Sequence, residues 1–187
     1  MTTRIEHDLL GTMEISNNVW YGIQTQRALD NFAITGVPIA HFPHLISALA
    51  MVKQAAASAN RDIGILAPEK AEAIIGACED IISGELHDQF QVDLIQGGAG
   101  TSTNMNANEV IANLALQNLG HAKGQYSNLH PNNDVNKSQS TNDAYPTAVR
   151  LGIVFSAKPL VTAIRGLKES LEEKALEFAD VLKMGRT

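Results

Sequence analysis

The sequence GGAGTSTNMNANEV, residues 97–110, joins a glycine-rich turn to the start of a predicted helix. Three glycines allow backbone conformations that other residues rarely adopt, and they let a ligand approach the main chain. The three hydroxyl residues that follow stand at a helix N-terminus, where free N–H groups and the helix dipole favour an anion. The stretch is neither a GxGxxG motif nor a Walker loop. A glycine turn with a threonine cap explains it equally well.

Predicted helices lie on both sides of this turn. Apolar residues at three- and four-residue spacing indicate helices over about 43–62 and 68–84. A proline at the first helical position and a glycine stop support the second of these. A third helix is expected over about 104–119, where Asn106 and Glu109 have the spacing of a capping-box variant.

The ends of the chain carry weaker patterns. Residues 4–16 partly alternate, which predicts a small hairpin, and residues 25–32 favour a short helix. The polar stretch 121–142 is long enough that such a loop is usually functional or disordered. A helical pattern then runs nearly to the end of the sequence, and Pro159 is expected to kink or interrupt it.

A second polar loop ends at this last helix start. It reads SQSTND at 138–143 and presents hydroxyl and amide groups. These residue types also cap helices well, so capping alone would account for it. Two such loops, both rich in hydrogen-bond donors and poor in cations, together indicate a site for a small carboxylate.

Composition limits the classes of function. The chain has 187 residues, a net charge of −6 and a pI of about 5.4, which argues against a nucleic-acid partner. Cys78 is the single cysteine, and its place on an apolar helix face predicts a buried small hydrophobe. No metal-ligand spacing is present, and uninterrupted apolar runs are shorter than a membrane span. We expect a cytoplasmic protein with no membrane partner and no metal.

Several segments together resemble the fumarase/aspartase superfamily. GGAGTSTNMNANEV at 97–110 resembles its first signature, and DVNKSQSTND at 134–143 its second. YGIQTQRALDNF at 21–32 is similar to its N-terminal region, and LKMGRT at 182–187 to the start of the stretch that carries its active-site histidine. The likeness covers the whole chain in the right order.

Within the superfamily, both signatures are closer to aspartate ammonia-lyases than to fumarases. The chain has GAGTSTN and STNDAYPT where fumarases tend to have GSGTQTN and SSND followed by Phe-Pro-Thr. The segment from His130 to Asn132 instead resembles the second-site loop of fumarases. That loop usually continues with aspartate, and Asn133 departs from the pattern, which puts a second anion site in doubt.

The resemblance implies reversible elimination of ammonia from L-aspartate to give fumarate, without a metal or organic cofactor. Thr101, Ser140 and Thr141 match positions that hold the substrate carboxylates. Asn142 matches a contact near the α-amino and carboxylate end, and Thr187 another substrate-binding position. No residue here matches the family's catalytic base, a serine on a Gly-Ser-Ser loop. The 187-residue chain is therefore expected to be inactive alone.

The resemblance also implies a mainly α fold. Residues 1–142 would form an N-terminal domain with a small β-hairpin, and residues 143–187 the first, truncated limb of a central helical bundle. Family members are homotetramers whose active sites draw on three subunits. Two alternatives stay open: a class II-type fumarate hydratase and a non-catalytic helical assembly module, in which the polar loops would only cap helices.

Overall fold

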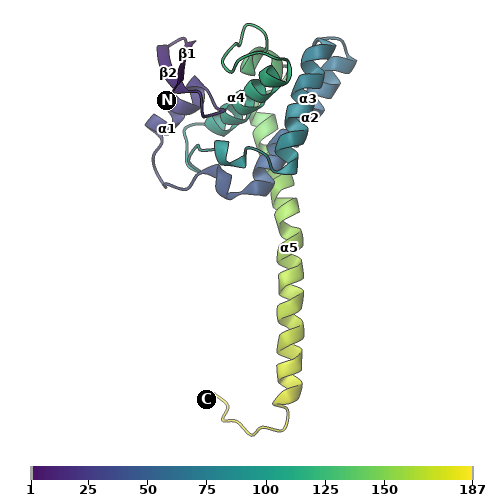
Figure 1. Cartoon of the computed structure of the whole chain (residues 1–187). Coiled ribbons are helices and arrows are strands. Elements are labelled where there is room, and N and C mark those ends of the chain that lie inside the picture. The colour runs from purple at the N-terminus through teal and green to yellow at the C-terminus, as the bar shows by residue number, and fades with distance from the viewer. Residues whose placement is uncertain (1, 187) are drawn as a thin grey trace.

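The computed structural model describes residues 2–186, and most of its helices begin and end at signals visible in the sequence (Figure 1). Helix α2 (Pro43–Asp62) and helix α3 (Pro68–Ser83) both have a proline in the first turn. Gly84, with a φ of +112°, ends α3 in the left-handed region that glycine tolerates best. Both predicted helices are confirmed, and they pack side by side.

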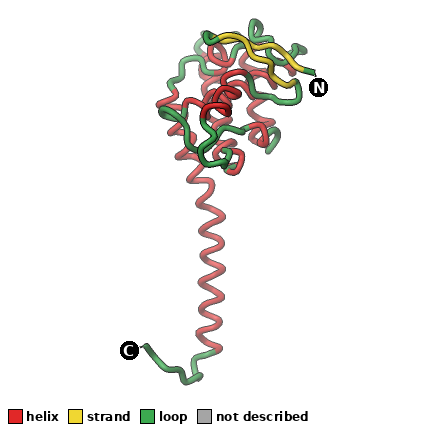
Figure 2. Tube along the Cα trace, turned by 90° about the vertical axis from the view of Figure 1, so that its left-hand side faces the viewer, coloured by secondary structure: helices red, strands yellow, loops and turns green. Residues whose placement is uncertain are grey.

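The N-terminal segment forms the expected hairpin. Strand β1 (Thr3–Asp8) pairs antiparallel with β2 (Gly11–Ser16), so that Thr3 lies opposite Ser16. The short helix α1 (Ile23–Asn31) follows, close to its predicted position. Figure 2 shows the hairpin on the outside of a small helical head. Two short 3-10 turns, η1 (Ile39–His41) and η2 (His87–Gln89), complete this part of the chain.

Helix α4 (Thr101–Asn118) runs through the middle of the head and is buried along most of its length. It begins at Thr101, three residues earlier than expected, because Gly100 adopts a φ of +83° and serves as its N-cap residue. Alanines and β-branched residues of α4 pack against α3, and Cys78 of α3 is buried among them as predicted. Burial raises the pKa of the Cys78 thiol well above its ordinary value.

The predicted capping box of α4 is wrong. Asn106 and Glu109 both lie inside the helix and are buried. The Glu109 carboxylate instead caps α1, where it accepts hydrogen bonds from the backbone N–H groups of Gly22 (2.9 Å), Gln24 (2.8 Å) and Thr25 (3.0 Å). It also accepts one from the Thr25 hydroxyl at 2.6 Å. Spacing alone did not reveal this because the partners lie far away in the sequence.

The polar stretch 121–142 is ordered by turns and by a single π-helical turn, η3 (Pro131–Val135). His130 caps this turn, since its Nδ1 accepts hydrogen bonds from the backbone N–H groups of Asn132 (3.0 Å) and Asn133 (3.3 Å). Lys70 of α3 pairs with Asp134 at 2.8 Å and ties the turn to the helical head. The segment is therefore packed against the core.

Helix α5 (Thr141–Glu177) extends away from the head as a rod of 37 residues (Figure 1). Its first turns pack on α2, and Ala144, Ala148 and Gly152 are its buried residues. Of the kink or interruption expected at Pro159, the interruption is wrong, because the helix continues through this residue. Proline removes one backbone hydrogen bond, and the turns on either side retain theirs.

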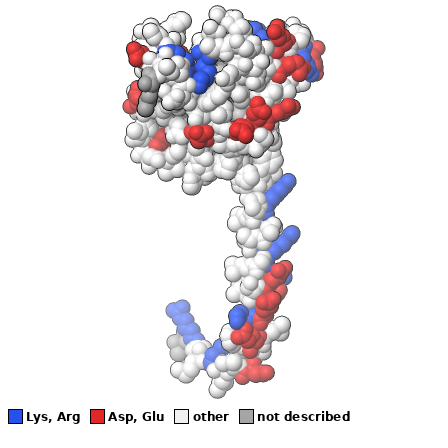
Figure 3. All heavy atoms as spheres, viewed as in Figure 1, with Lys and Arg blue, Asp and Glu red and all other residues white. Residues whose placement is uncertain are grey.

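Beyond Gly152, α5 exposes apolar side chains separated by three, four or seven residues, so that they follow one face of the helix. Ile153, Leu160, Ile164, Leu167 and Leu171 are between 55% and 64% exposed. Figure 3 shows charged side chains gathered along one edge of α5 and uncharged ones along the other. Apolar residues that repeat in this way form the seam along which helices pair. We call these five residues the α5 seam.

Helix α5 also has the length and composition of a membrane span. An 18-residue window within it has a mean hydropathy of 1.4, and 11% of that window is buried. The sequence expectation missed this window because it counted uninterrupted apolar runs, which Arg150 and Lys158 break. Core helices of soluble proteins pass the same test.

The fold as a whole is mainly helical, as expected, with one small antiparallel sheet.

Candidate functional site

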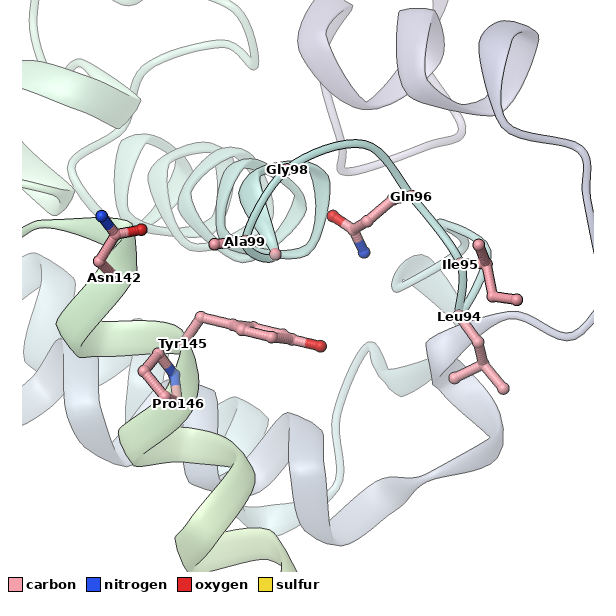
Figure 4. A pocket seen from close by; sticks show the side chains of 9 residues that line it. Leu94, Ile95, Gln96, Gly98, Ala99, Asn142, Tyr145 and Pro146 are labelled. Carbon is pink, nitrogen blue, oxygen red and sulfur yellow. The ribbon is translucent and has the colours of Figure 1, made fainter.

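The two polar loops identified in the sequence meet at one cavity. It has a volume of about 570 Å³ and lies between the turn that precedes α4 and the first turns of α5 (Figure 4). Gly98, Ala99 and Gly100 line one side, and Asn142, Tyr145 and Pro146 line the other. Leu94, Ile95 and Gln96 close a third side. The fold thus brings together two segments that are about forty residues apart in sequence.

The Tyr145 ring forms part of the cavity wall. Figure 4 shows the ring beneath the glycine turn, with its hydroxyl group directed into the open space. A Cβ atom at Gly100 would lie 2.3 Å from Cδ1 of this ring, so only glycine fits there. The φ of +83° at the same residue is a second reason for glycine.

The predicted binding residues stand at the starts of the two helices. Thr101 is the first residue of α4 and is exposed, and Thr141 is the first residue of α5 and is half-buried. Ser140 is the N-cap residue of α5, and its hydroxyl accepts a hydrogen bond from the backbone N–H of Asn142 at 3.2 Å. Asn142 is exposed and lines the cavity. Thr187 lies outside the described residues.

The cavity suits a small anion. Two helix N-termini border it, and each presents the positive end of a helix dipole. Its lining, within residues 2–186, contains no lysine, arginine, aspartate or glutamate side chain. Of the predicted binding residues described by the structure, Asn142 lines the cavity, and Thr101, Ser140 and Thr141 do not. The Asn142 amide and the Tyr145 hydroxyl are neutral groups that can donate hydrogen bonds to a carboxylate. The capping role of Ser140 also shows that part of this chemistry is structural.

Gln96 holds the glycine turn in place. Its Oε1 accepts a hydrogen bond from the backbone N–H of Thr103 at 2.8 Å, and its Nε2 donates to the Thr103 hydroxyl at 2.6 Å. Thr103 is fully buried, so this hydroxyl serves the fold. Sequence reasoning assigned no role to Gln96 or to Tyr145, although Tyr145 lies within the STNDAYPT segment that follows the second polar loop.

A buried polar cluster lies behind the two loops. The Lys53 ammonium group of α2 donates hydrogen bonds to Oδ1 of Asn104 (2.7 Å) and to Oδ1 of Asn136 (2.8 Å). The Asn104 amide also donates to Oδ1 of Asn136 at 3.0 Å. Burial lowers the pKa of Lys53 to about 7. Sequence reasoning missed this lysine because a single lysine in a helix normally reaches solvent.

A second cavity, of about 650 Å³, lies between the hairpin, α1 and the His130 turn. His130 and Asn132 line it, as do the carboxylates of Asp8 and Glu109. Burial lowers the pKa of His130, which favours the neutral ring that caps η3. A neutral histidine beside two acidic side chains is a poor setting for a second anion. Within residues 2–186, no group of three or more His, Cys, Asp or Glu side chains is placed to hold a metal ion.

Comparison with known proteins defines the class of protein. A family model described as lyase matches residues 11–187, and the chain therefore belongs to this lyase family. Among its curated relatives, the aspartate ammonia-lyase of Pseudomonas aeruginosa is 60% identical over 186 residues. The aspartate ammonia-lyase of Escherichia coli strain K12 is 51% identical over 185 residues. The chain spans about 39% of the length of each of these relatives.

Solved structures confirm the fold. A fumarate lyase:delta crystallin from Brucella melitensis, in native form, superposes with a TM-score of 0.96 at 54% identity. A class II fumarase from Schistosoma mansoni superposes with a TM-score of 0.87 at 34% identity. All of this chain is covered in both cases, against 43% and 39% of those chains. The structure thus has the architecture of the part of fumarate lyases and fumarases that it matches.

Proposed function

We propose that this chain supplies the carboxylate-binding loops of an aspartate ammonia-lyase, which reversibly eliminates ammonia from L-aspartate to give fumarate. The observation that carries the proposal is the convergence of the glycine turn before Thr101 and the start of α5, including Asn142, on one cavity lined by uncharged side chains. Relatives named aspartate ammonia-lyase, at 51% to 60% identity, support it.

The chemistry explains why such loops are needed. A base removes a proton from the carbon next to the β-carboxylate, the C–N bond breaks, ammonia leaves and a C=C bond forms. The intermediate carries two negative charges on its carboxylate, so fixed donors aimed at that carboxylate lower the barrier. In this proposal Thr101, Ser140, Thr141 and Thr187 bind substrate, and Asn142 makes a contact near its α-amino and carboxylate end. The base lies outside these residues. No metal or organic cofactor takes part.

The α5 seam supports a homotetramer. Its apolar residues repeat like those of a helical bundle, and the opposite edge of the helix is charged. This pattern favours packing against other helices over contact with lipid, so we infer no membrane partner.

The net charge of −6 argues against nucleic acid as a partner. We also infer a cytoplasmic location. We place a domain boundary between residues 142 and 143, where the bundle begins.

A chimaera tests the proposal. This chain replaces the matching 186 residues of the P. aeruginosa aspartate ammonia-lyase, and fumarate formation from L-aspartate and from L-malate is followed by ultraviolet absorbance. We expect fumarate from aspartate alone. Fumarate from malate alone would make the chain part of a hydratase. A folded tetramer without either activity would favour the hypothesis of a non-catalytic helical assembly module.

Substitutions in the chimaera test the binding residues. Thr101→Ala and Thr141→Ala are each expected to lower kcat/KM for L-aspartate by roughly 10²-fold, because each removes a donor to the developing charge. Thr12→Ala, an exposed threonine of the hairpin, is the matched control and should change nothing. Normal kinetics in either active-site variant would contradict the assignment. The 187-residue chain alone is expected to form no fumarate.

A further inference from the structure

Lys53 lies at the point where three parts of the fold meet. It stands in the middle of α2, and its side chain is fully buried. Its ammonium group donates to Asn104, in the first turn of α4, and to Asn136, just before the second polar loop. One side chain therefore contacts the supports of both loops that border the 570 Å³ cavity.

Further hydrogen bonds carry this contact to the residues next to the binding groups. The backbone N–H of Asn104 donates to the carbonyl of Gly100 at 2.9 Å, directly before Thr101. The Asn136 amide donates to the carbonyl of Gln139 at 3.2 Å, directly before Ser140. A path of hydrogen-bonded groups thus runs from Gly100, at the end of the glycine turn, to Gln139, within the second loop. Movement of either amide in the cluster would shift a predicted binding residue.

Core packing does not explain the lysine. An ammonium group loses its hydration when it is buried, and this costs free energy unless it is well paired. The two oxygens that accept from Lys53 belong to neutral amides and not to carboxylates. A methionine would fill a similar volume without this cost. A cluster with this cost is expected where the loop geometry that it fixes is needed for function.

We propose that Lys53, Asn104 and Asn136 form a junction that fixes the glycine turn and the Ser140 loop relative to each other, so that Lys53 is a positioning residue for substrate binding. The part of this proposal that concerns L-aspartate rests on the proposed function. The part that concerns loop geometry does not. The two links can therefore be tested separately.

Loop geometry is tested on the chain itself by amide hydrogen exchange. Lys53→Met is expected to speed exchange in residues 137–142 by tenfold or more, with little change in α3. Lys123→Met is the matched control. It also removes a partly buried ammonium, one that donates to the carbonyl of Asn17 and lies 4.4 Å from the Trp20 ring centre. This control should leave residues 137–142 unchanged.

Substrate positioning is tested in the chimaera. Lys53→Met is expected to raise KM for L-aspartate by roughly ten- to a hundredfold, because displaced loops bind the carboxylates poorly. Lys123→Met should leave KM as it is. If Lys53→Met does not fold, Asn136→Ala carries the test, since it removes the same link from a half-buried position and should give the same two effects.

Each outcome has a definite meaning. Faster exchange in residues 137–142 together with a higher KM would support the junction. Unchanged exchange in the loop, or equally faster exchange throughout the chain, would overturn it. Faster loop exchange with an unchanged KM would overturn the positioning role of Lys53 and leave the junction itself supported. A chimaera that is inactive even without substitutions would refute the proposed function, and the exchange result would still decide whether the junction exists.

Discussion

The Tyr145 ring packs directly against Gly100 at the wall of the cavity: a Cβ atom at Gly100 would lie 2.3 Å from the tyrosine ring. The contact joins the start of α5 to the turn that begins α4. It fixes the spacing between the two helix N-termini that border the cavity. The absence of a side chain at Gly100 is therefore part of the site's shape.

Gly100→Ala is expected to destabilise the chain more than Gly120→Ala. Both glycines have nearly the same φ, +83° and +81°, so both substitutions carry the same backbone strain of about 1–2 kcal/mol. A Cβ atom at Gly120 meets nothing within 4 Å. Alanine at residue 100 meets the tyrosine ring, which adds about 1–3 kcal/mol of overpacking. Urea unfolding followed by Trp20 fluorescence measures the difference.

A double substitution isolates the contact. Tyr145→Ala removes the ring, so adding it to Gly100→Ala should bring the combined loss below the sum of the two single losses. Strict additivity would show that the ring and the turn do not interact.

Glu109→Ala should release the N-terminus of α1. It leaves three backbone N–H groups and the Thr25 hydroxyl without their acceptor in a buried place. Unpaired buried donors cost about 1–3 kcal/mol each, so we expect a loss of at least about 3 kcal/mol in urea unfolding. Glu169→Ala, at an exposed position of α5, is the control and should cost little. Equal stability of the two variants would refute the capping role.

The stability contributed by Lys53 should depend on pH. Burial lowers its pKa to about 7 in the folded chain, against 10.5 as its ordinary value. Between these values the unfolded chain binds more protons, so stability rises as pH rises. The nearby Cys78 thiol has an ordinary value of 9.0, which makes pH 7 to 8.5 the clean window. The free energy of unfolding should rise relative to Lys53→Met by about 1 kcal/mol per pH unit there.

Urea unfolding of both proteins at several pH values checks this prediction. The comparison with Lys53→Met cancels groups that titrate in both. A constant difference across the window would mean that Lys53 is charged in the folded chain, and a falling difference would reverse the predicted sign.

The α5 seam should drive self-association of the chain. Ile164→Lys places a charge among its apolar residues and is expected to reduce association in sedimentation velocity. Thr162→Lys adds the same charge about two hundred degrees around the helix, and it should leave association unchanged. Association that is insensitive to Ile164→Lys, or a wild-type chain that stays monomeric at high concentration, would contradict the role of the seam.

Local signals in the sequence predicted much of the fold. Helices α2 and α3 were placed almost to the residue because proline starts them and glycine ends the second. The hairpin followed from alternation around Gly11. Hydroxyl and amide residues that gather before two helix starts also indicated the two segments that border the 570 Å³ cavity. The family resemblance was needed to connect them.

Features that depend on distant residues were not predictable in this way. Glu109 looked like a local cap because its spacing from Asn106 fits one, but its partners belong to α1. Lys53 looked like an ordinary helix residue, and only the folded chain places it beside Asn104 and Asn136. Pro159 indicated an interruption of α5, but the helix continues through this residue. Each error concerns a contact that spacing along the chain does not encode.

The Glu109 cap also sets an order of events during synthesis. Gly22 and its acceptor are separated by 87 positions in the chain. At a translation rate of roughly 5–20 residues per second, the ribosome needs about 4 to 17 seconds to add them. Throughout that interval the N-terminus of α1 lacks the carboxylate that satisfies its N–H groups. The nascent chain must keep its first helix open to chaperones and proteases until α4 has emerged.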